Sequence, residues 1–593
     1  MPFQRFLRRD SGVAALIFLT FVLVYGIFSR LGIDMHHDGI MLKPALDVAS
    51  GQSLFRETFT QYGPLSTYLQ AFAILILGPK LLSLRIATTL AYGAAASFFY
   101  LAWRCFLSVR LSLVAIWGWF LFAPFFSGSW NFMPWSSAFG LVFQALALWL
   151  FLRAGWDQDP KRRPLLHFAG AGAAIALAFL SRQPVGFLSG ISLLPVVFVW
   201  PHPAQGRWKP TGAYLGGAVS VVAAYVAFLA SRGDLSEAFY QTVTWPARWS
   251  SDYASSPLNV IGNLFPYRDT RIALLVTLGL VFLPTALKNR EKIGARARIG
   301  WTLGALGFTV AALARIPLTG MTLLQMSTGG WASVVPFSAL VFGVALALRK
   351  WNAGSAIPGP QRAVIASAAL GAASWAQYFP VPCQLHIFWS IGPAFGAFVL
   401  LFHSYLKSTP RWTAATLLLL FAPALIERLE QGSVKLQAAD TPMPQESVLS
   451  GIWAARSEVE VYTQSWDAVR EYESQHSDTP ILTHGPHALF NGFAANLANP
   501  GPIYVVWPGL LRDTDERARE RFILEKQPIV LFEEVEFKHR DIDGFMRKFG
   551  YGIWKRIPGL DQVYLVQKQG ANTLTPGRPT SYNQSAPDIP VNR

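Results

Sequence analysis

Apolar stretches of about 20 residues recur through the first three quarters of the 593-residue chain, and an α-helix needs this length to cross a ~30 Å hydrocarbon core. Hydrophobic residues make up 52% of the chain and charged residues only 14%, whereas a soluble domain carries about 25% charged residues. A water-soluble protein of this size would lack the polar side chains to cover its surface. The sequence therefore predicts a polytopic membrane protein and excludes secreted, disordered and fibrous classes.

We expect about thirteen membrane spans, some of them short enough to need tilting or close packing. The first apolar stretch is long, lacks a small-residue cleavage site and is followed by further spans, so it is interpreted as a retained helix and not as a signal peptide. The expected spans are residues 12–30, 82–103, 111–127, 135–152, 165–180, 184–200, 211–230, 271–287, 299–314, 331–348, 363–379, 387–403 and 412–426.

The formal net charge of +16 would suggest nucleic acid as the partner of a soluble protein. Cytoplasmic loops of membrane proteins collect Lys and Arg, however, and every loop expected inside is basic when the N-terminus is placed in the cytoplasm. This alternation predicts two long outside loops, residues 31–81 and 231–270, and an outside C-terminal region. We expect membrane lipid and no nucleic acid among the partners.

From Glu427 onward, charged residues become dense and apolar runs become short. The alternation of helical and strand-like segments predicts a small α/β domain, with helices over 464–476 and 512–526 and strands over 481–483, 503–507, 529–532 and 563–566. The expected fold class is thus an all-α polytopic membrane domain (1–426), an extracytoplasmic α/β domain (427–569) and a disordered tail (570–593).

Two carboxylates, Asp34 and Asp38, follow the first expected span within a few residues of the membrane boundary, where charges are costly and tend to be functional. Residues four apart share one face of a helix. This spacing suits a general base, a ligand set for a divalent cation such as Mg or Mn, or both. A helix cap or a solvated acid remains the alternative. His36 and His37 add imidazoles that could bind a metal or a phosphate.

The segments Gly-Ile-Asp-Met-His-His-Asp-Gly at 32–39, Gly-Gln-Ser-Leu-Phe-Arg-Glu at 51–57 and Tyr-Gly-Pro-Leu at 62–65 together resemble the GT-C superfamily of membrane glycosyltransferases. The branch with this pattern contains protein mannosyltransferases, the aminoarabinose transferase of lipid A and lipopolysaccharide sugar transferases. In this family the first outside loop commonly carries His-x-Asp-Glu. Asp38 takes the Asp position, but Gly39 stands where Glu is common, which leaves open a single-carboxylate and an Asp34-assisted version.

The resemblance implies transfer of a sugar, hexose or pentose, from a polyprenyl-phosphate carrier to a glycan, lipid or protein acceptor of the cell envelope, on the outer face of a bacterial inner membrane. Asp38 is then expected to be the base that deprotonates or positions the acceptor, with Asp34 as its partner or as a metal ligand. The leaving phosphate needs donors and cations, for which the expected residues are His37, Lys43, Arg182, Gln183, Arg315 and His386. Snorkelling or pairing with lipid phosphate is the alternative for the cations.

A polytopic lipid or glycan transporter or flippase is the main competing hypothesis, and a non-catalytic glycan-binding protein is a third. Against transport, the sequence has no inverted repeat and few charges within the spans. Aromatic clusters that include Trp135 and Trp245 lie near the expected outer boundary. They are interpreted mainly as an interfacial belt, with sugar stacking as the alternative for Trp245 and Trp249.

Overall fold

The computed structural model divides into two compact units, Met1–Glu460 and Val461–Arg593. The expected domain boundary at 426/427 falls inside one continuous helix, Pro410–Ala438, so the division between units lies later in the chain. The structure describes residues 2–126, 131–156, 164–199, 206–251, scattered positions between 300 and 343, 359–375, 377, 384–406, 409–485, 503, 511–533, 542–556 and 563–569.

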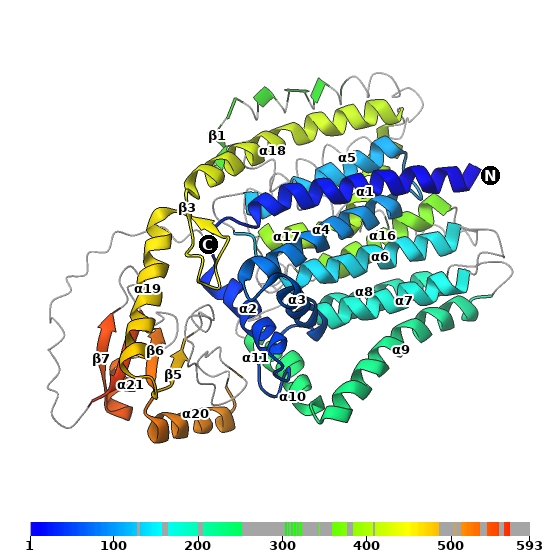
Figure 1. The fold of residues 1–593 in the computed structure, drawn as a ribbon. Helices are drawn as coiled ribbons and strands as arrows, with labels where there is room; N and C mark the ends of the chain where they lie inside the picture. Colours follow the sequence, from blue (N-terminus) through cyan, green and yellow to red (C-terminus); the bar gives the residue numbers. More distant parts are fainter. Residues whose placement is uncertain are drawn as a thin grey trace. The chain divides into compact units, whose positions relative to one another are not determined.

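The first unit is helical, as expected (Figure 1). Six of its described helices are long and apolar enough to cross a membrane, namely the apolar part of α1 and of α6 together with α4, α7, α9 and α18, so the chain is an integral membrane protein. The spans expected at 271–287 and 331–348, and most of 299–314, lie outside the described residues, and the total of thirteen stays a prediction. The helices are α1 (Pro2–Phe28), α2 (Met35–Ala49), α3 (Pro64–Leu77), α4 (Leu81–Trp103), α5 (Val109–Phe120), α6 (Ser136–Trp156), α7 (Pro164–Ser181), α8 (Gln183–Phe198), α9 (Trp208–Arg232), α10 (Leu235–Phe239), α11 (Trp245–Ser251), α16 (Gly359–Trp375), α17 (Gln384–Leu406) and α18 (Pro410–Ala438).

Local sequence explains where several helices begin. The Ser108 side chain accepts a hydrogen bond from Leu111 N–H at the start of α5, and Thr409 does the same for Trp412 at the start of α18, which satisfies backbone donors that the first turn leaves free. Pro64 occupies the first position of α3, where its missing N–H costs nothing.

The membrane helices pack side by side, with α4 between α1 and α6, and α7 between α6 and α9 (Figure 1). The short helices α2, α3, α10 and α11 gather at the end of this bundle that lies away from the N-terminus. There, Arg56 pairs with Asp234 at 2.6 Å, and the Gln241 side chain bonds the backbone of Phe55 and of Thr60. The two loops expected on one side of the membrane therefore meet, while the side itself stays a prediction.

The second unit contains the expected small α/β domain. Its four-stranded sheet has the order β5-β6-β8-β7, with β5 parallel to β6 and the other pairs antiparallel. Helix α19 (Arg456–Gln475) leads into this unit. Residues 504–507 and the tail 570–593 lie outside the described residues. The remaining elements are β5 (Ile481–His484), α20 (Asp513–Lys526), β6 (Ile529–Glu533), α21 (Ile542–Phe549), β7 (Tyr551–Arg556) and β8 (Val563–Lys568).

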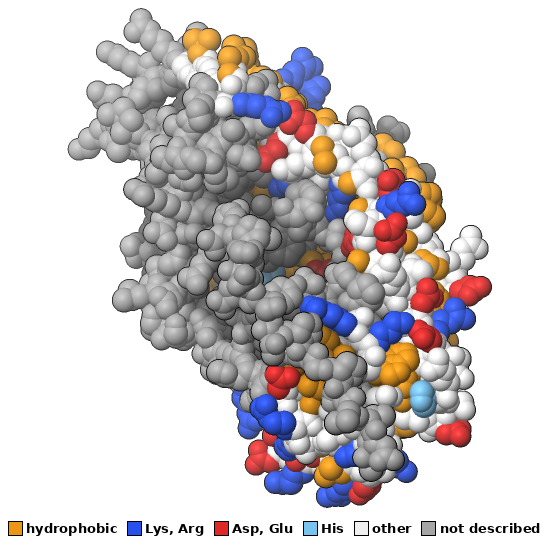
Figure 2. Space-filling model, turned by 90° about the vertical axis from the view of Figure 1, so that its left-hand side faces the viewer, with side chains coloured by type: hydrophobic (Ala, Val, Ile, Leu, Met, Phe, Trp, Pro, Cys, Tyr) orange, Lys and Arg blue, Asp and Glu red, His pale blue; other side chains and the backbone are white. Residues whose placement is uncertain are grey.

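Charged side chains of both signs alternate over the described part of the face shown in Figure 2. The lateral surface of α1 is apolar instead of charged. It exposes a stripe formed by Leu16, Leu19, Leu23 and Ile27. These residues recur at three- and four-residue spacing, which places them on one helix face. The opposite face buries Phe21 and Tyr25.

Candidate active site

Helix α2 begins at the acidic motif. Asp34 is its N-cap, and its carboxylate accepts hydrogen bonds from the backbone N–H of His37 at 2.7 Å and from Nδ1 of the same residue at 2.9 Å. In return, the backbone N–H of Asp34 donates to Oδ2 of Asp38 at 2.8 Å. Asp34 is thus a helix cap, which is the alternative given for it from the sequence, and the two acids cap one helix end reciprocally.

Asp38 is completely buried and forms an ion pair with Arg85 of α4, with 2.7 Å between Oδ2 and Nη2. Arg85 also donates from Nη1 to the carbonyl oxygens of Ser29 and Leu31. Oδ2 therefore has two donors, whereas Oδ1 is buried without a partner among the described residues. A buried carboxylate oxygen without a donor is costly, so Oδ1 is left able to accept one further hydrogen bond.

Burial raises the pKa of Asp38 from its usual value of 3.8 to about 6. The Arg85 charge lowers this pKa and the neighbouring Asp34 charge raises it, but both effects are smaller than the loss of solvation. A carboxyl group with a pKa near 6 is well matched to proton transfer near neutral pH.

The backbone before Asp34 is fixed from two sides. Gly32 has a φ of +67°, and a Cβ there would overlap the Asn131 side chain, so glycine suits this position on both grounds. Asn131 donates to the carbonyl oxygen of Ile33 at 2.8 Å. On the other side, strand β4 (Trp453–Ala454) bridges to this segment, because Gly32 N–H donates to Trp453 O at 2.8 Å.

The side chain of Trp135 lies at the centre of the candidate site. Its ring contacts the rings of His37 and Tyr62 at centroid distances of 4.9 and 5.0 Å. It also stacks on Trp389 at 6.4 Å, which in turn lies 5.5 Å from the ring of His386. We call these five residues the Trp135 cluster.

Arg182 joins the Trp135 cluster from the turn between α7 and α8. Its guanidinium lies 4.8 Å from the centroid of the Tyr62 ring, and it has no carboxylate partner among the described residues. The neighbouring Gln183 donates to the Gln61 carbonyl at 3.5 Å. An arginine on an aromatic face keeps most of its donors for a ligand.

Close packing of two backbones brings Tyr62 and Arg182 together. A Cβ on Gly63 would overlap the carbonyl group of Leu180, and Ser66 Oγ donates to Ser181 O at 3.1 Å. The turn before α3 therefore packs directly against the end of α7. This contact places Tyr62, next to Gly63, against Arg182, which follows α7.

Two expected phosphate-binding cations have carboxylate partners instead. Lys43 Nζ contacts both carboxylate oxygens of Asp47 at 2.5 and 2.6 Å in a buried pair on α2. Arg315 forms a two-pronged pair with the exposed Glu430 at 2.7 and 2.8 Å. Neither contact includes a residue of the acidic motif or of the Trp135 cluster, so their roles in substrate binding stay predictions.

The structure shows no metal site at the two acids in the part of the chain that it describes. Among the described residues, no group of three or more His, Cys, Asp or Glu side chains could hold a metal ion. The Arg85 guanidinium already supplies a positive charge 2.7 Å from Asp38 Oδ2, and a second cation close by would be repelled by it. The expected Mg or Mn site at Asp34 and Asp38 therefore stays a prediction.

Sequence reasoning missed Arg85, Tyr62 and the central position of Trp135. Arg85 is a charged residue inside the expected span 82–103. Burial of a charge in the membrane costs free energy unless the charge is paired, so its position in the sequence could have indicated an ion-pair partner. The interpretation of Trp135 and Trp245 as an interfacial belt was wrong, because their exposed fractions are only 6% and 1%. Trp245 packs on Phe59 at 5.1 Å, which also leaves it unavailable for sugar stacking.

Residues 61–229 match the family described as dolichyl-phosphate-mannose-protein mannosyltransferase. No curated protein sequence matches the chain. Among solved structures, the chain is similar to oligosaccharyltransferase AglB from Archaeoglobus fulgidus in complex with an inhibitory peptide and a dolichol-phosphate, with 14% identity, 87% of this chain and 69% of that chain covered and a TM-score of 0.43.

Two further structures show comparable similarity. The Archaeoglobus fulgidus oligosaccharyltransferase in complex with Zn and sulfate has 14% identity, 88% and 68% coverage and a TM-score of 0.46. ArnT from Cupriavidus metallidurans bound to undecaprenyl phosphate has 10% identity, 95% and 98% coverage and a TM-score of 0.42.

The match to the mannosyltransferase family covers residues 61–229 and agrees with the resemblance found in the first outside loop. More particularly, residues 61–229 carry the pattern of the protein mannosyltransferase family. This segment includes Tyr62, Arg85, Trp135 and Arg182, whereas Asp34 and Asp38 precede it.

Proposed function

We propose that the protein transfers a sugar from a polyprenyl-phosphate carrier to a hydroxyl or amine of a cell-envelope glycan, lipid or protein. One observation carries this proposal: Asp38 is a fully buried carboxylate with Oδ2 held by Arg85 and Oδ1 without a partner among the described residues. A buried, oriented carboxylate with a raised pKa is the arrangement that a general base requires.

The transfer step balances as a displacement at the anomeric carbon. The acceptor oxygen or nitrogen forms a bond to this carbon while its proton passes to Oδ1 of Asp38. The bond between the anomeric carbon and the phosphate oxygen breaks, and the polyprenyl phosphate leaves with the electron pair. Arg85 stays bound to Oδ2 and keeps Asp38 in the orientation needed for this proton transfer.

The leaving phosphate needs a positive charge and hydrogen-bond donors. Arg182 suits this role, because it has no carboxylate partner among the described residues and lies on the Tyr62 ring beside the Trp135 cluster. His37 and His386 belong to the same cluster, and Gln183 follows Arg182 directly in the chain. The relatives that bind dolichol-phosphate or undecaprenyl phosphate support a lipid phosphate as the ligand.

We further propose a topology in which the acidic motif lies outside the cytoplasm. The N-terminus is then cytoplasmic, the α/β domain is extracytoplasmic and the membrane is a bacterial inner membrane. The support is the distribution of Lys and Arg between loops and the meeting of the two long loops at one end of the bundle.

Reconstitution in liposomes tests this function. The purified protein is given radiolabelled polyprenyl-phosphate hexoses or pentoses, together with a lipid, glycan or peptide acceptor fraction. We expect labelled product with wild type, no product with Asp38→Asn, and retained product with Asp440→Asn, which removes an exposed carboxylate away from the candidate site. Movement of a fluorescent polyprenyl-phosphate sugar across the bilayer with no product from any acceptor would favour a flippase and overturn the proposal.

A further inference from the structure

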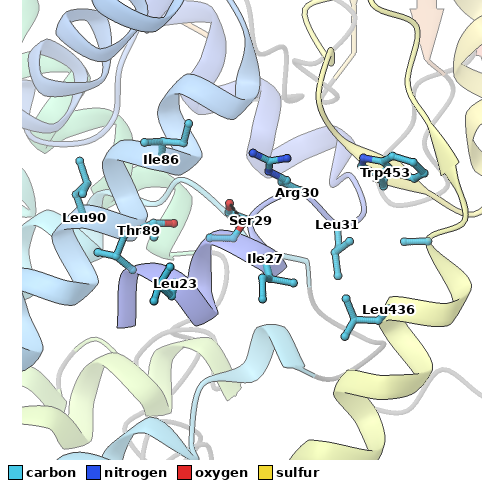
Figure 3. A pocket seen from close by; sticks show the side chains of 13 residues that line it. Leu23, Ile27, Ser29, Arg30, Leu31, Ile86, Thr89, Leu90, Leu436 and Trp453 are labelled. Carbon is cyan, nitrogen blue, oxygen red and sulfur yellow. Dashed lines mark hydrogen bonds between the residues drawn. The ribbon is translucent and has the colours of Figure 1, made fainter. Parts of the chain in front are cut away.

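A groove of about 500 Å³ lies between α1, α4, the end of α18 and strand β4. Figure 3 shows side chains of α4 on one side of it and side chains of α18 and β4 on the other, with α1 between them. The labelled residues are Ile86, Thr89 and Leu90 of α4, Leu436 and Trp453 on the opposite side, Leu23 and Ile27 of α1, and Ser29, Arg30 and Leu31, which follow α1.

The inner part of the groove is apolar and open to the membrane. Leu23 and Ile27 line it, yet 70% and 54% of their surfaces remain exposed. Both residues belong to an apolar membrane-spanning segment, so their exposed surfaces face hydrocarbon. A lipid chain can therefore enter the groove from the side, without crossing a polar barrier.

The other end of the groove is polar and positively charged. Arg30 follows α1 directly, is exposed and has no hydrogen-bond or ion-pair partner for its guanidinium among the described residues. Trp453 stands beside it with 40% of its surface exposed, and tryptophan is enriched where a bilayer meets water. An unpaired cation next to a tryptophan at the end of a membrane-spanning helix can bind the phosphate of a lipid headgroup.

The groove is separate from the candidate active site. None of Asp34, Asp38, Arg85 and Arg182 lines it. A phosphate at Arg30 would be separated from Asp38 by the backbone of residues 29–31, whose carbonyl groups bind Arg85. A sugar donor must bring its phosphate within reach of the base, so the groove does not suit the donor.

We propose that this groove binds one anionic phospholipid of the surrounding bilayer. An acyl chain lies along Leu23, Ile27 and Leu436, and the phosphate lies against Arg30 and the indole of Trp453. The lipid then supports the turn at residues 29–31 on the side opposite Arg85. The proposal concerns binding and does not depend on sugar transfer.

The binding test uses native mass spectrometry of the full chain released from nanodiscs that contain phosphatidylcholine with or without phosphatidylglycerol. Wild type should retain one phosphatidylglycerol, and Arg30→Gln should reduce the retained fraction at least fivefold. Arg110→Gln is the control, because Arg110 is an exposed arginine in α5 that does not line the groove. Equal retention by wild type and Arg30→Gln would overturn the proposal.

A second variant tests the chain-binding part without changing charge. Gly26 lines the groove, and a Cβ there meets nothing within 4 Å, so the side chain of Gly26→Leu starts in open space and takes up part of the groove. Gly12→Leu is the matched control on α1, where a Cβ also meets nothing within 4 Å. Loss of phosphatidylglycerol with Gly26→Leu alone supports the proposal. Retention with both variants, or displacement of phosphatidylglycerol by undecaprenyl phosphate at equal concentration, would contradict it.

Discussion

The Arg85 guanidinium donates a 2.7 Å hydrogen bond to Oδ2 of Asp38, and neither side chain is exposed to any extent. The two residues lie on different helices, α4 and α2, and 47 positions apart in the chain. A buried ion pair of this kind stabilises little by itself, but loss of one partner leaves an uncompensated buried charge. The pair therefore fixes the position of the proposed base.

Removal of Arg85 alone should destabilise the first unit. We expect Arg85→Gln to cost about 3–5 kcal/mol, because Asp38 would remain buried without its cation. The double variant Arg85→Gln with Asp38→Asn should recover most of this loss, since neither charge is then present. Thermal unfolding in nanodiscs measures both effects, and additive losses in the double variant would show that the two residues do not interact.

Arg182 should contribute mainly to donor binding. Arg182→Gln removes a cation that has no carboxylate partner among the described residues, and we expect the KM for the polyprenyl-phosphate sugar to rise about tenfold or more. Arg411→Gln is the matched control, because that arginine is exposed at the start of α18 and no prediction places it in the phosphate site. Donor-concentration series in liposomes measure the KM, and equal effects of the two variants would remove Arg182 from the phosphate site.

Gly63→Ala should separate Tyr62 from Arg182. The added methyl group would overlap the Leu180 carbonyl, and such overpacking costs about 1–3 kcal/mol. We expect weaker donor binding together with a lower unfolding temperature. Gly216→Ala on α9, where a Cβ meets nothing within 4 Å, should change neither property. Unchanged donor binding in Gly63→Ala would mean that this backbone contact does not position the site.

Chelation of divalent cations should leave the transfer rate within about twofold of its starting value, because Arg85 already places a positive charge beside Asp38. The rate in the presence of EDTA, with Mg or Mn added back, tests this expectation. A large loss of activity that Mn restores would show that a metal ion takes part after all.

The sequence predicted the features that depend on local pattern. The span positions follow from runs of apolar residues, and the cap formed by Asp34 was one of the alternatives because aspartate is a strong N-cap residue. The contacts of Asp38 with Arg85 and of Tyr62 with Arg182 could not be predicted, because each joins helices that are distant in the chain. Their formation depends on close approaches such as that of Gly63 to Leu180, which no periodicity encodes.

The pH dependence of single-turnover transfer tests the central claim most directly. Because burial raises the pKa of Asp38 to about 6, the base is protonated below this pH and ionised above it. The rate should therefore rise through about pH 6 and level off at higher pH. The Arg85 charge lowers this pKa and the Asp34 charge raises it, so Arg85→Gln should move the rise to higher pH and Asp34→Asn to lower pH.

His37→Gln is the control for this measurement, because His37 is another ionisable side chain that contacts Asp34, and it should leave the rise in place. Asp34→Asn keeps the test informative if Arg85→Gln does not fold. A rate that is flat between about pH 5 and 8, or a rise that moves with His37 and not with Arg85 or Asp34, would contradict the assignment of Asp38 as the base.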